Sequence, residues 1–456
     1  MGLTRRELLE RTAAAGLAAP LVHSGTSPTI VKPLRVLTMG IEWPDGMQRQ
    51  AELDLGFPIV LEAVTSSHEI DTVLKGGRSF DVFGGYSHQA MRVWFAGHLR
   101  PVDTRRIAAW RDLYPLFAHG RMAPHCRYGL GDAPFRSMFL RTGTRGLPTS
   151  TTGPTRSDEI VQWIDERTGK PFPGAPMPRY VVGVPAHFAA ESLGYLPDVI
   201  RKAPAHVAWA ELLNGRWKGR VAVQNDPAVA LVDLGRAVEA LGVMTFVNVA
   251  QMTVHEVDLL TRVLTVYRKQ GQFQETWSSF NDVVNLMASK DVAISPVWPS
   301  AAARIAAEGV RIGYAVPPQG YRGSSSSIGI SARVPAGPRL DACYAYLNWL
   351  YQGFFGAEMM RQGYYVANGK RLPEWIERFG ASLLGDPFNV AEYRYWYEGR
   401  PAPWPLTGVK GTHTIKRGSR REGGSIVERM CRCTAWGSYF HAAGYQARRF
   451  RDFVGA

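Results

Sequence analysis

The stretch Trp277–Gln319 constrains the fold most, because it alternates helical and extended patterns over a short length. Apolar residues recur at helical spacing over 280–288, and 292–294 form a short β-type run. Residues 301–308 predict a second helix that ends at a glycine, and 312–316 predict a second strand that two prolines halt. This order of helix, strand, helix and strand favours an α/β sheet.

Trp298 follows the first of these strands and lies on a turn between Pro296 and Pro299. Open α/β sheets bind ligands just outside the carboxyl ends of their strands, so this indole is a candidate wall of a ligand site. Large aromatic side chains also bury easily, and a lone tryptophan is often a core residue. Both interpretations of Trp298 stay open.

Four segments resemble one protein family in the same order along the chain. They are SFDVFGGYSHQAMRVWFAGHLRPVDTRRI, a strand and loop that begin at YVVGVP, AWAELLNGRWKGRVAVQNDP, and SKDVAISPVWPSAAARIAAEGVRIGYAVPPQG. The family is the extracellular solute-binding proteins of ABC importers, in particular the spermidine/putrescine-binding type. The resemblance covers roughly residues 34–370. It implies an α/β fold of two doubly wound lobes with an interlobe ligand cleft, like a type II periplasmic binding protein.

The resemblance also implies a division of the chain into parts. We expect a twin-arginine signal segment over 1–30, lobe 1 over 31–137 and 320–372, lobe 2 over 138–319, and a C-terminal extension packed on the lobes over 373–456. Of the 456 residues, 45% are hydrophobic and 20% are charged, which is typical of a soluble globular protein with a sizeable core. Aromatic residues at 436, 440 and 450 lie in a helix expected over 425–453, which we expect to cover lobe 1 because they need burial.

Periodicity and turn residues predict further elements outside the opening stretch. Strands are expected over 57–63, 220–223 and 327–331, and helices over 66–74, 158–166, 209–213, 228–241, 255–269, 340–350 and 356–362.

The N-terminus has the pattern of a targeting segment. Arg5 and Arg6 precede an alanine-rich apolar run over 13–22, which is shorter than the roughly 20 residues that span a bilayer. Paired arginines followed by apolar residues match the twin-arginine signal. We therefore expect export to the periplasm, with an amphipathic N-terminal helix as the alternative.

The formal net charge of +14 raises the question of a nucleic-acid partner. Nucleic-acid surfaces need a clustered basic face with interleaved aromatics, whereas here the arginines and lysines are scattered. We expect a solvated basic surface and no nucleic-acid partner.

Four cysteines are too few to hold a chain of this size together by disulfides. Cys431 and Cys433 are separated by one residue, a poor spacing for a mutual disulfide. No Cys-x-x-Cys pair and no companion histidine motif accompanies the cysteines at the spacing of a metal site, so we expect no metal. We expect free or incidental thiols, with a bridge between Cys126 and Cys343 as the alternative.

Lobe 1 contributes candidate ligand residues from two loops that follow strands. Glu42 and Trp43 follow the strand predicted over 34–39, and a carboxylate beside an indole suits a cationic or neutral organic ligand. The alternative is an exposed glutamate and a tryptophan packed on a helix. Tyr86 and Ser87 follow a strand that ends in two glycines, so we expect a second aromatic wall and a hydroxyl at the site.

Lobe 2 contributes candidates by the resemblance of its opening strand and loop. His187 and Glu191 could face the cleft, with a solvated loop histidine as the alternative. A catalytic histidine would need a nucleophile within reach, and no Gly-x-Ser-x-Gly elbow occurs in the sequence. Asn225 and Asp226 end the strand predicted over 220–223, where Asp226 could hold a ligand or simply cap the next helix.

The chain crosses back to lobe 1 at Tyr321 and Arg322. Polyamine-binding members of the family carry aromatic and acidic residues here, whereas this sequence has an arginine and a row of serines. A cation beside Arg322 costs about 1–4 kcal/mol at short range. The sequence therefore leaves open whether the solute is cationic, zwitterionic, anionic or polar and neutral.

Together these observations predict an exported, monomeric receptor that captures a small polar solute and passes it to the permease subunits of an ABC importer. Each lobe would supply part of the site, so the ligand would favour the closed form. We expect no cofactor and no catalytic residues. The alternative is an exported hydrolase that uses the same cleft.

Overall fold

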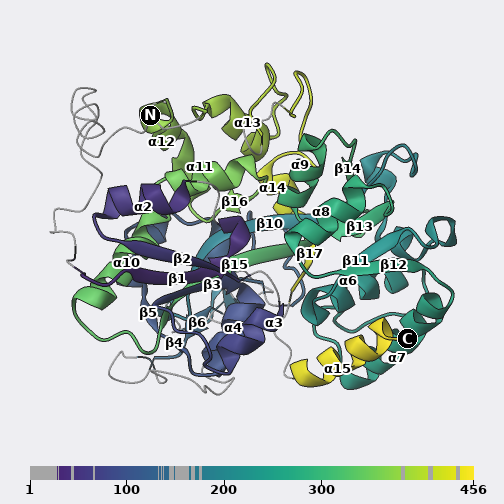
Figure 1. Ribbon diagram of the computed structural model, residues 1–456, viewed down its shortest axis with the longest axis horizontal. Coiled ribbons are helices and arrows are strands. Elements are labelled where there is room, and N and C mark those ends of the chain that lie inside the picture. The colour runs from purple at the N-terminus through teal and green to yellow at the C-terminus, as the bar shows by residue number, and fades with distance from the viewer. Residues whose placement is uncertain are drawn as a thin grey trace.

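The structure is a computed structural model of the chain (Figure 1). It describes residues 28, 30–42, 46–64, 67–131, 133–134, 136, 138–142, 148, 164–165, 170–173, 177–381, 386–408, 414–437 and 442–456. The twin-arginine pair, Trp43 and Phe440 lie outside these residues, as does most of the helix expected over 158–166. Among the helices described, none combines the length and the apolar character that crossing a bilayer requires.

Within the described residues, a mixed sheet of 12 strands runs through both halves of the molecule. In sheet order, its main path is β12 (Phe273–Trp277), β11 (Val221–Gln224), β13 (Ile294–Val297), β10 (Val184–Tyr195), β15 (Tyr321–Ser331), β3 (Val82–Tyr86), β1 (Leu34–Met39) and β2 (Ile59–Val64). Off this path, β14 (Gly313–Tyr314) and β16 (Tyr365–Val366) pair with β10, and β4 (Leu99–Arg100) and β17 (Cys433–Trp436) pair with β15. Smaller sheets join β5 (Val102–Asp103), β9 (Tyr180–Val181) and β6 (Phe139–Leu140), and β7 (Ile164–Asp165) with β8 (Lys170–Pro171).

The helices divide between two lobes that lie side by side in Figure 1. Lobe 1 carries α2 (Met47–Leu55), α3 (Ser67–Leu74), α4 (Ser87–Phe95), α5 (Pro115–His119), α10 (Pro338–Trp349) and α11 (Phe354–Arg361). Lobe 2 carries α6 (Pro227–Ala240), α7 (Val254–Lys269), α8 (Phe280–Ala288) and α9 (Pro299–Ala307). The C-terminal extension adds α12 (Leu372–Phe379), α13 (Val390–Glu398), α14 (Ile426–Cys431) and α15 (Ala443–Val454). Short 3-10 turns are η1 (Gly40–Glu42), η2 (Thr104–Arg106), η3 (Ala108–Asp112), η5 (Pro204–His206), η6 (Trp209–Leu213), η7 (Gly215–Trp217) and η8 (Gly369–Arg371).

The long strands β10 and β15 connect the lobes and are the hinge strands of the fold. They run antiparallel, from the Val184–Ile328 pair in lobe 1 to the Glu191–Arg322 pair at the junction. Beyond that point β10 leaves β15 and pairs with β13 of lobe 2. Separate apolar clusters fill the two lobes. The predicted fold of two α/β lobes is therefore confirmed.

Helix α7 shows how the sequence sets the helix ends in lobe 2. Thr253 and Glu256 form a reciprocal capping box at its start, and basic residues occupy its last turn. Helix α8 begins in the same way, with a capping box between Ser279 and Asp282. Helix α7 then packs against α15 and α6, and α8 packs against α9 and β13.

Several predicted elements differ from the structure at their ends or in type. The strand expected over 327–331 begins earlier, at Tyr321, because its serines pair with β10 and β3 despite their polar character. The helix expected over 209–213 is the 3-10 turn η6, and the second strand starts at Ile59. Tertiary pairing decides these cases over local propensity.

The C-terminal extension departs furthest from prediction, because the single helix expected over 425–453 is wrong. In its place the structure has α14, the strand β17, and then α15. β17 pairs parallel with β15, from Tyr321–Cys433 to Gly323–Trp436. Helix α15 lies beside α7 of lobe 2, as Figure 1 shows, and not on lobe 1. Helical periodicity alone does not reveal that a short segment has a strand partner far away in the sequence.

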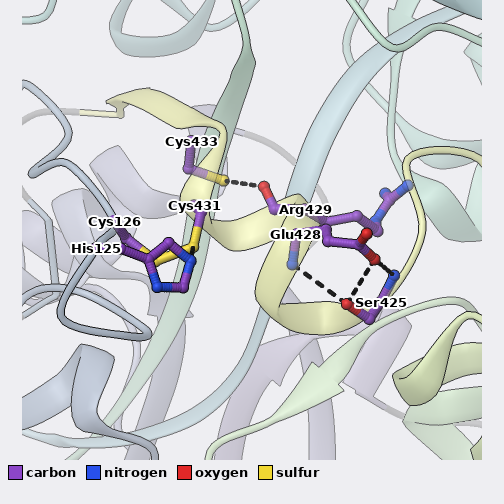
Figure 2. Close-up of a disulfide and its surroundings, with 7 residues drawn as sticks. All are labelled: His125, Cys126, Ser425, Glu428, Arg429, Cys431 and Cys433. Atoms are coloured by element: carbon purple, nitrogen blue, oxygen red, sulfur yellow. Dashed lines mark hydrogen bonds between the residues drawn. A yellow bond between two sulfur atoms is a disulfide. The ribbon is translucent and has the colours of Figure 1, made fainter.

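The expectation of four unpaired thiols is also wrong. Cys126 and Cys431 form a disulfide, with a Cα–Cα distance of 4.6 Å (Figure 2). In the described part of the chain Cys343 and Cys433 carry buried free thiols, so the alternative bridge from Cys126 to Cys343 is wrong as well. The bonded cysteines are 305 residues apart, and sequence spacing does not predict such a pairing.

Candidate functional site

A row of polar side chains follows the two hinge strands through the junction of the lobes. Glu191 lies opposite Arg322, and because side chains alternate along a strand, Ser324 and Ser326 share the face of Arg322. We call this face the polar strip; its members are His187 and Glu191 on β10, and Arg322, Ser324 and Ser326 on β15. A polar strip in the middle of a sheet is uncommon, because buried polar groups need partners.

Glu42 joins the strip from lobe 1, where η1 turns its side chain inward after β1. Its Oε1 lies 2.9 Å from Nδ1 of His187, and it accepts a hydrogen bond from Thr38. Ser326 Oγ lies 3.0 Å from the same nitrogen. Glu42 is 3% exposed and His187 is 0% exposed. The alternatives of an exposed glutamate and a solvated loop histidine are therefore wrong.

Gly84 on β3 allows this close approach. A Cβ atom at this position would lie 2.2 Å from Thr38 Oγ1 and 3.0 Å from Glu42 Oε2. A side chain there would collide with the pair that holds Glu42 in place.

Arg322 lies between two carboxylates at the other end of the strip. Its Nη1 is 2.6 Å from Glu191 Oε2, and its Nε donates to Asp233 Oδ1 at 2.8 Å. Ser324 donates to the second oxygen of Glu191 at 2.6 Å. Asp233 belongs to α6, so this group joins a hinge strand to lobe 2. Burial opposes the charge of Arg322, but Asp233 and Glu191 outweigh that effect and raise the pKa of the guanidinium.

Some buried polar atoms at the strip have no hydrogen-bond partner among the described residues. Among the described residues, Nε2 of His187 and Oδ2 of Asp233 have no hydrogen-bond partner although both atoms are buried. Burial raises the pKa of Asp233, and the attraction of Arg322 only partly offsets this. A buried polar atom without a partner is costly, so these atoms mark a place where a bound molecule could supply one.

Two tyrosines line the same region. The Tyr364 ring lies edge-on to His187, with 4.8 Å between centroids. Burial, and then the charge of Glu191, raises the pKa of both Tyr86 and Tyr364 well above the ordinary value. Both phenols therefore stay neutral and can donate hydrogen bonds at physiological pH.

The lobes also meet directly across the junction. His88 on α4 of lobe 1 lies with Nε2 3.7 Å from Oδ2 of Asp226 in lobe 2. Asp226 caps α6, because its side chain accepts from the Ala228 amide at 3.0 Å, as the alternative for this residue predicted. It therefore both caps a helix and faces lobe 1.

A cavity of about 10 Å³ lies at this contact, enough for about one water molecule. Its lining comes from both lobes, the hinge and the C-terminal extension: Tyr86, Ser87, His88, Val229, Arg322, Gly323, Ser324, Ser325, Trp436 and Gly437. A larger solute can enter only if these elements move apart.

The remaining predicted residues lie at the edge of the junction or elsewhere. Ser87 contacts Ser325, with 2.6 Å between their hydroxyls. Trp298 is partly buried before α9, and its ring packs edge-on against Trp277. It contacts the apolar clusters of both lobes, which fits the core interpretation. Asn225 is exposed and donates to Ser278, so the structure does not bring it into the strip.

Tyr321 is fully buried, and the guanidinium of Arg429 lies 5.0 Å from its ring centroid. Its ring therefore packs against the C-terminal extension, whereas Arg322 belongs to the strip.

Sequence reasoning missed His88, Asp233, Tyr364 and Trp436. Asp233 had a usable signal, since it follows directly after the apolar run PAVALV at the start of α6. A carboxylate on a buried helix face needs a partner, which here is Arg322. The other three residues become neighbours of the strip only through tertiary contacts.

The fold defines a class: two α/β lobes joined by long hinge strands, with polar groups at their junction, as in periplasmic binding proteins. Residues 148–370 match the family model described as bacterial extracellular solute-binding protein. Over these residues the chain is therefore similar to the bacterial extracellular solute-binding proteins. This family consists of transporter components and is not a class of enzymes.

Solved structures of such proteins have a similar fold. The spermidine/putrescine ABC transporter substrate-binding protein PotD from Streptococcus pneumoniae is 14% identical, with a TM-score of 0.53 over 92% of this chain and 98% of that chain. The Tp0655 (TpPotD) lipoprotein of Treponema pallidum is 12% identical, with a TM-score of 0.54 over 93% of this chain and 100% of that chain. The PBP MotA from A. tumefaciens B6, solved in complex with glucopine, is 10% identical, with a TM-score of 0.51 over 93% of this chain and 100% of that chain. A comparison with curated proteins finds no match.

Proposed function

We propose that this protein is the solute-binding component of an ABC importer and that it captures a small polar organic solute at the polar strip. The observation that carries the proposal is the placement of incompletely satisfied buried polar atoms where both lobes and both hinge strands meet. A solute that pairs with these atoms would contact both lobes at once. Its binding would therefore favour the form in which the lobes are together.

The charges of the strip favour a solute that carries an amino group. Four carboxylates face the junction, and Arg322 is held by two of them at 2.6 and 2.8 Å. The arginine is therefore already neutralised and repels a cation less than its position in the sequence suggests. The other two carboxylates lie near imidazoles, Glu42 at 2.9 Å from Nδ1 of His187 and Asp226 at 3.7 Å from Nε2 of His88. An organic cation or an amino-acid-like zwitterion suits this arrangement.

The relatives support this range of solutes. One is named for spermidine and putrescine, and another was solved in complex with glucopine. We propose a similarly small, polar and nitrogen-containing ligand for this chain. Export to the periplasm by the twin-arginine route, a monomeric state and docking on inner-membrane permease subunits belong to the same proposal, supported by the family and by the N-terminal sequence.

The hydrolase alternative gains no support from the geometry of the strip. Ser326, His187 and Glu42 are the residue types of a hydrolytic triad. In a triad the hydroxyl and the carboxylate contact different ring nitrogens, so that one nitrogen can take up the proton while the other is held. Here both oxygens contact Nδ1, and Ser326 is 0% exposed.

A thermal-shift screen of the full mature chain tests the proposed function. The panel contains putrescine, spermidine, GABA, amino acids, sugars and dicarboxylates, and each hit is then incubated with the protein and analysed by mass spectrometry. We expect stabilisation by an amine or zwitterion that is recovered unchanged. Chemical conversion of the hit, or no stabilisation by any member of the panel, would overturn the proposal.

A further inference from the structure

The C-terminal extension makes a third crossing between the lobes, in addition to β10 and β15. On one side the disulfide from Cys431 fastens it to Cys126 in lobe 1. On the other side α15 packs on lobe 2, where Tyr445 and Arg449 contact Asp258. Between these anchors, β17 pairs with the hinge strand β15. The extension is therefore built into the junction.

The strand β17 places the Trp436 ring flat against the hinge. A Cβ atom at Gly323 of β15 would lie 2.6 Å from this ring, and one at Gly129 would lie 2.5 Å from its Nε1. Only glycine at these positions admits the indole so closely. A Cβ atom at the following residue, Gly437, would lie 3.3 Å from Nδ1 of His88. Trp436 and Gly437 both line the cavity between the lobes.

The segment before β17 is held by contacts with lobe 1 and with the hinge strand β10, and Figure 2 shows its capping box and its disulfide. Helix α14 begins with a capping box between Ser425 and Glu428. Arg429 is buried and donates to the Ala190 carbonyl of β10 at 3.1 Å, while Cys431 at the end of the helix carries the disulfide. β17 starts only two residues after that disulfide, at Cys433. The position of Trp436 therefore depends on how α14 is fastened.

From these contacts we infer that Trp436 is a specificity-determining wall of the solute site and that the strand tethered by Cys126–Cys431 positions it. The inference rests on the proposed function and names the surface that the solute meets when the lobes come together. An indole face attracts an organic ammonium group and packs against the methylene groups beside it. The acidic groups of the strip would then fix the amino group, while Trp436 selects for the shape of the carbon skeleton.

Calorimetric titration with the strongest hits of the panel tests this role. The proteins are the wild type, Trp436→Ala, Trp436→Phe, the double variant Cys126→Ser/Cys431→Ser, and Trp404→Ala as the matched control. Trp404 lies in the same extension and is 50% exposed, so we expect its loss to change the dissociation constant less than twofold. We expect Trp436→Ala to weaken binding about tenfold and to change the order of preference among the hits.

A purely structural role for Trp436 would lower all affinities by a common factor, so the changed order of preference separates the two roles. Circular dichroism establishes which variants fold. If Trp436→Ala does not fold, Trp436→Phe decides the matter, with an expected two- to fivefold loss and a changed order. We expect the double cysteine variant to weaken binding as well, because β17 loses its anchor on lobe 1.

Different results would contradict the proposed function and the inference about Trp436. Wild-type protein that binds no member of the panel would contradict the proposed function and the inference that rests on it. Wild-type protein that binds while both Trp436 variants keep its affinities and their order would overturn the inference alone.

Discussion

Two groups of charged side chains in this molecule differ in how completely their buried carboxylates are hydrogen-bonded. At the periphery of lobe 2, Glu211 accepts hydrogen bonds from Lys202, from Asn214 at 2.9 Å and from Trp217 at 2.7 Å. Both of its oxygens therefore have partners. At the junction of the lobes, Asp233 has a partner for one oxygen only among the described residues.

The pKa values of the two carboxyl groups follow this difference. Burial alone would raise the pKa of Glu211, but the hydrogen bonds from Lys202, Trp217 and Asn214 outweigh it and lower the pKa. For Asp233 burial prevails and raises the pKa. A satisfied group stabilises the fold, whereas an incompletely satisfied buried group costs free energy and is typical of functional sites. The contrast is why we place the solute at the polar strip and not at the surface of lobe 2.

The largest expected effect concerns Arg322, which neutralises two buried carboxylates. Arg322→Met would leave Glu191 and Asp233 buried without their counter-charge, and we expect a loss of about 3–5 kcal/mol in the free energy of unfolding. Urea unfolding followed by circular dichroism measures it. The triple variant Arg322→Met/Glu191→Gln/Asp233→Asn serves as control and should recover at least half of the loss. A loss below about 1 kcal/mol in the single variant would contradict the charge pairing described here.

A smaller effect is expected at Glu211, where the partners are polar and partly exposed. We expect Glu211→Gln to cost about 1 kcal/mol at pH 7. Because the folded-state pKa lies below the ordinary value of 4.5, the contribution is present above that pH and is lost as the pH falls through the folded value. Melting curves of the wild type and the variant from pH 7 to pH 3 should therefore converge at the acidic end. A difference in stability that persists unchanged at pH 3 would contradict this assignment.

The smallest effect is expected at Asn225, which the sequence placed in the site but the structure leaves exposed beside Ser278. Asn225→Ala should change the free energy of unfolding by less than about 0.5 kcal/mol, as is usual for exposed positions. It should also change the affinity for the strongest solute of the panel less than twofold. A tenfold loss of affinity with unchanged stability would show that the site extends to this end of β11.

The sequence predicted the parts of the fold that depend on local pattern. The strand over 34–39 and the helix over 280–288 agree with β1 and α8, because each is a clear periodic run with a defined end. Glu42, Tyr86 and Asp226 were predicted from their places at or just after strand ends, where α/β folds bind ligands, and the structure brings all three to the junction of the lobes.

What the sequence did not predict depends on contacts between distant segments. The Cys126–Cys431 disulfide joins residues 305 positions apart, and β17 exists because β15 offers it a partner. His88 and Asp233 lie on helices, and only the packing of these helices brings their side chains to the junction. Trp436 was assigned to a helix over lobe 1, because its aromatic character indicates burial but not the surface against which it is buried.

The most direct test of this account makes the same substitution in both groups of charges. The strongest solute of the panel is titrated by calorimetry into the wild type, Glu191→Gln and Glu211→Gln. The account predicts one solute bound per wild-type chain, an affinity at least about tenfold weaker for Glu191→Gln, and an affinity within about twofold of the wild type for Glu211→Gln. Equal affinities of the wild type and Glu191→Gln would contradict the placement of the solute at the polar strip.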